Sequence, residues 1–178
     1  YTRVKELLKN VGNNEYYMIC TDIKDFKLVN DVFGVEKGDE LLVSISNSMR
    51  FFDRGQAKAV YGRISGDRFA VCVPKERFKE KLFIKAIRQL GEVSENRAYH
   101  VYIHVGVYLI SDTSLEVSVM CDRAFMAINA IKDSYTEIIA YYDEKLRDAR
   151  IHEKKITSEF DKAIRNGQFR MFLQPQID

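Results

Sequence analysis

Hydrophobic residues recur along the chain with two spacings, one typical of strands and one typical of helices. Runs rich in apolar, β-branched or aromatic residues predict buried strands at residues 16–23, 98–110 and 138–143. Apolar residues spaced three and four apart predict helices over the first residues to about Gly12 and in the segments 24–34, 38–52, 78–90 and 114–132. A long charged helix is predicted over about 144–166. This order fits an α/β sandwich, with helices packed on both sides of a mixed β-sheet.

A β-hairpin is predicted in the middle of the chain. Two apolar runs, 59–61 and 69–73, flank the polar stretch Ser65-Gly66-Asp67-Arg68. Gly66 and Asp67 tolerate a positive φ, which a tight hairpin turn requires. The turn therefore carries a carboxylate and a guanidinium side by side.

Two carboxylates are candidates for a metal site. Asp22 lies at the end of the strand 16–23, and Asp67 lies at the tip of the hairpin. If these two elements are neighbours, both carboxylates meet at one edge of the sheet, where such a pair can hold Mg²⁺ together with phosphate oxygens. The spacing alone favours the plainer interpretation, in which Asp67 is a turn residue and Asp22 a solvated strand end.

Composition narrows the function further. The chain has 178 residues, 46% apolar and 30% charged, enough for the core of one domain with an additional segment at one end. A net charge of +2 with both signs interspersed indicates neither nucleic acid nor a membrane surface as the main partner. The three cysteines are far apart among apolar neighbours, which indicates buried thiols in a reducing compartment, and we expect a cytoplasmic location. No apolar run is long enough to span a bilayer, although the chain reads as part of a longer protein that could be membrane-anchored elsewhere.

The segment TDIKDFKLVNDVFGVEKGDELL (21–42), followed by RISGDRF (63–69), closely resembles the GGDEF domain of diguanylate cyclases. The resemblance covers roughly residues 1–143. It implies a palm-like α/β fold similar to adenylyl cyclases and polymerases. It also implies a dimer in which each protomer presents one GTP, and two GTP condense to cyclic di-GMP with loss of pyrophosphate.

The same resemblance implies roles for individual residues. Asp22, the carbonyl of Ile23, and Asp67 occupy metal-ligand positions. Asn30 and Asp39 match the pair that reads the guanine edge, since a carboxylate accepts from the base N1–H and N2–H₂ while an amide both donates and accepts. Backbone N–H groups near Phe26 match a turn that cradles phosphate. Local alternatives stay open: Asp39 as a helix N-cap, and Asn30 as part of the turn chemistry before Gly34.

Departures from the family pattern are concentrated at the catalytic positions. The signature reads Ser65-Gly66-Asp67-Arg68-Phe69, with Arg68 in place of a Glu. Lys24 replaces a second Asp, and Val35 replaces a His. The four positions that are usually acidic therefore sum to zero charge, which weakens Mg²⁺ binding, and Arg68 cannot act as a base. We expect no intact catalytic set.

Two further family elements are altered. Asn129 and Asp133 stand where the family has a Lys and an Arg that contact the triphosphate, with Lys132 as a partial substitute. Residues 56–59, Gln-Ala-Lys-Ala, stand where the family has the R-x-x-D motif of product inhibition, so the inhibitory site is expected to be absent.

The C-terminal stretch EFDKAIRNGQFRMFLQPQID (159–178) resembles the opening of an EAL cyclic di-GMP phosphodiesterase domain, in which a helix leads into a strand. This predicts a GGDEF-like domain over 1–143, a connecting helix over 144–167 and the start of a truncated EAL domain over 168–178. The alternative is a solvated terminal helix with alternating charges.

The sequence thus predicts a cyclase-inactive GGDEF domain that regulates an attached EAL domain, with GTP as its ligand and Mg²⁺ doubtful. Two other hypotheses stay open: a weak diguanylate cyclase that uses Asp22 and Asp67, and a scaffold for dimerisation or a protein partner that binds no nucleotide. An RNA-binding module is disfavoured, because the aromatic strand 98–110 lacks basic surroundings.

Overall fold

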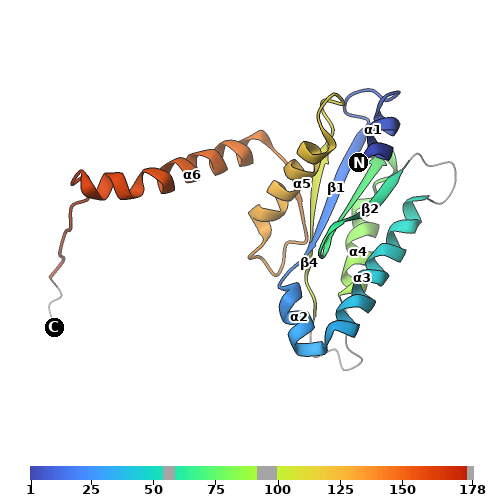
Figure 1. Ribbon diagram of the computed structural model, residues 1–178, viewed down its shortest axis with the longest axis horizontal. Coiled ribbons are helices and arrows are strands. Elements are labelled where there is room, and N and C mark those ends of the chain that lie inside the picture. Colours follow the sequence, from blue (N-terminus) through green and yellow to red (C-terminus); the bar gives the residue numbers. More distant parts are fainter. Residues whose placement is uncertain (54–58, 92–99, 176–178) are drawn as a thin grey trace. The chain divides into compact units, whose positions relative to one another are not determined.

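The computed structural model describes residues 1–53, 59–91 and 100–175, in two compact units, Tyr1–Tyr142 and Asp143–Asp178 (Figure 1). The first unit contains one five-stranded mixed sheet in the order β2-β3-β1-β4-β5. The strands are β1 (Tyr16–Ile23), β2 (Val60–Ser65), β3 (Arg68–Pro74), β4 (Ile103–Leu109) and β5 (Ile139–Tyr141). The predicted α/β fold, a mixed sheet flanked by helices with a hairpin that carries the signature turn, is confirmed.

Helices cover both faces of this sheet. They are α1 (Thr2–Leu8), α2 (Phe26–Phe33), α3 (Val35–Met49), α4 (Glu80–Leu90) and α5 (Val117–Ile131), with short 3₁₀ segments at Arg50–Asp53 and Lys75–Arg77. Figure 1 shows α5 on one side of the sheet, and α3 and α4 on the other. Each side has its own apolar core, because the two faces of the sheet are buried separately.

Strand β1 is the centre of the sheet, antiparallel to both β3 and β4. Its side chains alternate, so Met18 and Cys20 belong to the core under α5 while Ile19 and Ile23 belong to the core under α3 and α4. Burial on both faces explains why the strand reads as an unbroken apolar run. Thr21 is opposite Phe69 in the ladder, which brings the end of β1 beside the start of β3.

Several predicted boundaries are wrong. The strand predicted over 98–110 begins at Ile103, because its partner β1 ends at Ile23 and leaves no strand to pair with further upstream; residues 98 and 99 lie outside the described residues. The closing strand is confined to Ile139–Tyr141, and the first helix ends at Leu8.

The second unit contains the helix α6 (Glu144–Arg165), close to the predicted limits. Asp143 caps it, since its side chain accepts a hydrogen bond from the N–H of Lys145 at 2.9 Å. None of its residues is buried. Residues 168–175 have no regular secondary structure. No helix in the described residues combines the length and apolarity of a membrane span.

All three cysteines are free and buried, as predicted. Cys20 of β1, Cys72 of β3 and Cys121 of α5 share the core under α5, and the Sγ of Cys20 lies 3.9 Å from the carbonyl oxygen of Cys121, to which it donates. Burial raises the pKa of the Cys72 thiol from its ordinary 9.0 to about 12, and the nearby Cys121 adds to the shift. Cys72 is therefore a neutral thiol in the folded protein.

This raised pKa predicts a loss of stability in alkali. Between pH 9 and 12 the unfolded state has released the Cys72 proton while the folded state retains it, so the free energy of unfolding falls as pH rises. In Cys72→Ala this contribution is absent, and we expect its free energy of unfolding to decline less steeply over that range. Urea denaturation of both proteins across a pH series measures the two slopes. Equal slopes would contradict the assignment.

Candidate functional site

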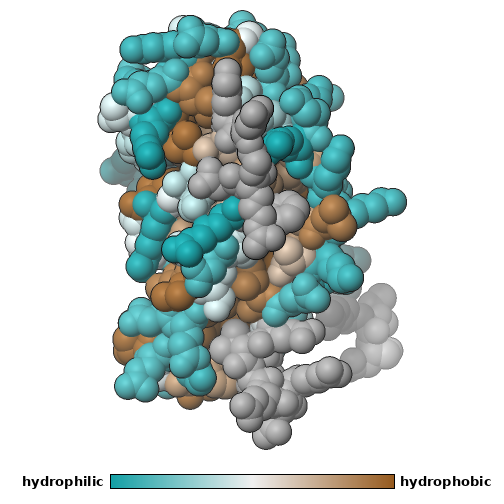
Figure 2. Space-filling model, turned by 90° about the vertical axis from the view of Figure 1, so that its right-hand side faces the viewer, coloured by the Kyte–Doolittle hydropathy of each residue, from teal (hydrophilic) through white to brown (hydrophobic). Residues whose placement is uncertain are grey.

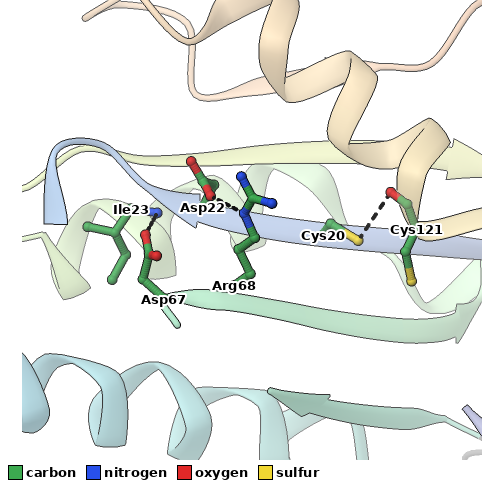
Figure 3. Close-up of polar contacts among 6 residues, drawn as sticks. All are labelled: Cys20, Asp22, Ile23, Asp67, Arg68 and Cys121. Carbon is green, nitrogen blue, oxygen red and sulfur yellow. Dashed lines mark hydrogen bonds and ion pairs between the residues drawn. The ribbon is translucent and has the colours of Figure 1, made fainter. Parts of the chain in front are cut away.

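The end of β1 and the start of β3 bring together the residues predicted for the metal site (Figure 3). The Oδ2 of Asp67 accepts a hydrogen bond from the backbone N–H of Ile23 at 3.0 Å. The Nε of Arg68 donates to the Oδ1 of Asp22 at 2.9 Å. Both carboxylates thus lie where the end of β1 meets the start of β3, and each accepts a hydrogen bond from another group of the protein.

The hairpin turn explains how these two side chains reach the edge. Gly66 has a φ of +53°, whereas Asp67 does not adopt the positive φ that the sequence allowed for it. A register shift between Arg63 and Ser65 adds a bulge, and the Nε of Arg63 donates to the carbonyl oxygen of Gly66. Asp67 and Arg68 then leave the turn toward β1.

Arg68 is held on two sides. Besides its bond to Asp22, its guanidinium lies 4.9 Å from the ring centroid of Phe125 on α5. Phe125 was not singled out from the sequence, because a contact between distant elements leaves no local pattern. The consequence is a fixed positive charge against one of the two carboxylates.

Asp67 has a raised pKa. Partial burial is the main cause, and the negative charge of Asp22 raises the pKa further, while the hydrogen bond from Ile23 and the charge of Arg68 act in the opposite direction.

Lys24, which stands at a usually acidic position of the family pattern, contacts the C-terminal end of α5. Its Nζ donates to the carbonyl oxygen of Lys132 at 2.7 Å and lies 4.6 Å from the ring centroid of Tyr135. The ammonium therefore satisfies a carbonyl at the C-terminal end of α5, where helix carbonyls lack partners. Of the two cations at usually acidic positions, Arg68 contacts a carboxylate of the site, whereas Lys24 contacts the end of α5. Asn129, Lys132 and Asp133 are exposed at that end.

The residues predicted to read guanine lie between α2 and α3. The Oδ1 of Asn30 is buried and has no hydrogen-bond partner among the described residues. It faces the buried Gly38, where a Cβ would overlap that oxygen and lie 3.3 Å from the Cζ of Phe26. Only glycine at position 38 leaves room for the Asn30 amide against α3. Asp39, the next residue, is exposed.

Two local alternatives for these residues are resolved by the helix boundaries. Gly34, with a φ of +86°, ends α2 and is also the N-cap of α3, so Asp39 lies inside the helix and its interpretation as an N-cap is wrong. The turn before Gly34 uses the backbone carbonyl of Asn30, which accepts the Gly34 N–H at 2.9 Å. The amide side chain of Asn30 is left for another role. Near Phe26, Asp25 has a φ of +53° and leads into the first turn of α2, where its carbonyl oxygen accepts a hydrogen bond from the N–H of Leu28 at 2.8 Å.

The donor set fits a two-metal centre poorly. Within residues 1–53, 59–91 and 100–175, no group of three or more His, Cys, Asp or Glu side chains is placed to hold a metal. The acidic ligands that Mg²⁺ would require reduce to Asp22, which is bonded to Arg68, and Asp67.

A mixed sheet with helices on both faces and an acid-bearing hairpin beside its central strand defines an α/β palm-like domain. The chain belongs to the GGDEF family: the model described as "Diguanylate cyclase, GGDEF domain" matches residues 1–137. The predicted inhibitory positions 56–58 lie outside the described residues.

Proteins related in sequence support this family assignment. The chain is 25% identical over 173 residues to the probable diguanylate cyclase DgcE of Escherichia coli, covering 94% of this chain and 15% of that protein. It is 20% identical over 171 residues to the bifunctional diguanylate cyclase/cyclic di-GMP phosphodiesterase MucR of Pseudomonas aeruginosa, covering 93% of this chain and 24% of the relative. It thus spans a minor part of these proteins. In fold it is similar to the active GGEEF domain of a Vibrio cholerae diguanylate cyclase, with a TM-score of 0.57, 22% identity and coverage of 80% and 88%.

Proposed function

We propose that this chain is a GGDEF domain of a cyclic di-GMP signalling protein that binds GTP without converting it to cyclic di-GMP and regulates an EAL domain of the same protein. The observation that carries the proposal is the ion pair between Arg68 and Asp22, at 2.9 Å, where the family pattern has acidic residues.

The ion pair argues against cyclase chemistry for two reasons. A dication is held by the net negative charge of its carboxylates, and Arg68 cancels the charge of Asp22. Activation of the attacking hydroxyl also needs a group that accepts a proton, and a guanidinium stays protonated at all accessible pH values. Asp67 alone is left for both tasks.

The region between α2 and α3 supports nucleotide binding. A buried acceptor without a partner, such as the Oδ1 of Asn30, costs free energy that a donor on a ligand can offset. The guanine edge supplies such donors. Asp39, the neighbour of Gly38 on α3, is exposed and can accept further hydrogen bonds from the base. These groups do not depend on a metal.

Regulation of an EAL domain rests on the relatives and on the C-terminal sequence. MucR is named as both a diguanylate cyclase and a cyclic di-GMP phosphodiesterase. We propose that residues 144–167 connect this domain to an EAL domain that begins at about residue 168, and that nucleotide binding biases the arrangement of the two through differential affinity. A homodimer of GGDEF domains is part of the same proposal.

Incubation of the purified chain with GTP and Mg²⁺ tests the proposal, with the product separated by chromatography and GTP binding measured by calorimetry. We expect GTP to bind with or without Mg²⁺ and no cyclic di-GMP to form. In the double variant Lys24→Asp/Arg68→Glu, binding is expected to become Mg²⁺-dependent, because acidic ligands return to the site. Formation of cyclic di-GMP by the natural chain would instead identify a weak cyclase, and absence of binding would identify a scaffold.

A further inference from the structure

A cavity of about 650 Å³ lies between α3 and α4, on the side of the sheet away from α5. Its volume is in the range of sites that enclose a small molecule. Ile45 and Met49 of α3 and Phe83 and Ile87 of α4 form apolar walls. On the side of the molecule seen in Figure 2, apolar surface is visible between hydrophilic side chains.

Small side chains create this space. Thr21 of β1, Ser48 of α3 and Ala86 of α4 all line the cavity, where bulkier residues would fill it. The cavity thus results from the small side chains at the interface between the helices and the sheet. It shares no residue with the site at Asp22 and Asp67 or with Asn30 and Asp39.

Thr21 provides a buried polar group in the cavity. It is 1% exposed, and its Oγ1 has no hydrogen-bond partner among the described residues. Its neighbours on the same face of β1 are Ile19 and Ile23, which are apolar. A buried hydroxyl without a partner is unfavourable, so its presence in the lining points to a ligand atom that bonds to it.

The lining also indicates what kind of ligand fits. The buried lining residues other than Thr21 are apolar: Ile45, Met49, Phe52 and Ile87. The charged lining residues, Glu76, Arg77 and Lys79, are exposed. A charged group placed against Thr21 would lose its hydration without gaining an ion pair there, so the head group must be neutral.

We propose that the cavity between α3 and α4 binds a neutral, mainly apolar small molecule that carries one hydroxyl or carbonyl group, held by a hydrogen bond to Thr21. This inference is independent of the proposed nucleotide function, because the two sites use different residues.

Two probes of equal shape test the proposal on the 178-residue chain: 1-naphthol, and 1-methylnaphthalene with a methyl group in place of the hydroxyl. Binding is followed by saturation-transfer NMR and fluorescence titration. We expect 1-naphthol to bind more tightly. Thr21→Val, which keeps the shape of the side chain, is expected to weaken 1-naphthol binding about 5-fold and to leave 1-methylnaphthalene binding unchanged.

A second pair of variants tests the location. Ala86→Phe fills the cavity and is expected to weaken both probes at least about 10-fold, whereas Ala130→Phe, at an exposed position on α5, leaves both unchanged. Circular dichroism establishes that each variant is folded. Failure of both probes to bind, an equal effect of Thr21→Val on the two probes, or an unchanged affinity in Ala86→Phe would each overturn the proposal.

Discussion

Replacement of Gly106 by alanine is expected to destabilise the fold by about 3 kcal/mol. Gly106 lies in β4 under α5, where an added Cβ would overlap the carbonyl oxygen of Ala124 and lie 2.8 Å from its carbonyl carbon and 2.9 Å from the Cγ1 of Ile128. The obstacle is helix backbone, which cannot rotate away as a side chain can. α5 would have to move from the sheet, and much of the core under it would open.

Gly62 of β2 is the matched control. An added Cβ there meets nothing within 4 Å, and the residue is exposed on an outer strand. Gly62→Ala is expected to change the free energy of unfolding by no more than about 0.5 kcal/mol. Urea denaturation of the two variants measures the difference. Similar values for both would show that α5 does not pack on Gly106 as described.

The second large effect concerns nucleotide affinity. If Asp39 accepts hydrogen bonds from guanine, Asp39→Ala removes charge-assisted bonds and is expected to weaken GTP binding about 100-fold while leaving the fold unchanged. Glu40→Ala is the matched control, since Glu40 is the adjacent exposed acid on α3 and is paired with Lys37 at 2.6 Å. Calorimetric titration of GTP into both variants compares them.

The control separates base recognition from general charge. GTP is an anion, so loss of a nearby carboxylate on charge grounds alone would strengthen binding in both variants. A third variant, Gly38→Ala, displaces the Asn30 amide without removing a charge and is expected to weaken GTP binding about 10-fold. Unchanged affinity in Asp39→Ala would remove the base-recognition role.

Much of the fold was predictable because the signals are local. The apolar run at 16–23 and the turn at Gly66 each specify their element with a few neighbouring residues. The convergence of Asp22 and Asp67 followed from the pairing of β1 with β3. Asp39 was open to a wrong interpretation, because its own neighbours fit an N-cap, whereas the helix begins earlier, at Val35, with Gly34 as its N-cap.

The parts that sequence could not give depend on contacts between distant elements. The side chain of Lys24 could extend toward Asp22 or toward α5, and only the position of the α5 C-terminus decides between them. The contacts of Arg68 with Asp22 and Phe125 could not be predicted either, because they also join elements that are far apart in the sequence. The cavity beside Thr21 is space left between α3 and α4. It depends on how the helices pack, and no sequence pattern predicts it.

Strand β1 stands between two partners that are synthesised well after it. Tyr17 pairs with Val73 on one side and with Leu109 on the other. On the ribosome, residues 16–23 therefore emerge as an apolar segment with no strand to pair with, and both of its edges are covered only after β4 has been made. Unpaired apolar strands associate with other chains. The synthesis of β4 is thus the step that covers the second edge of this apolar strand.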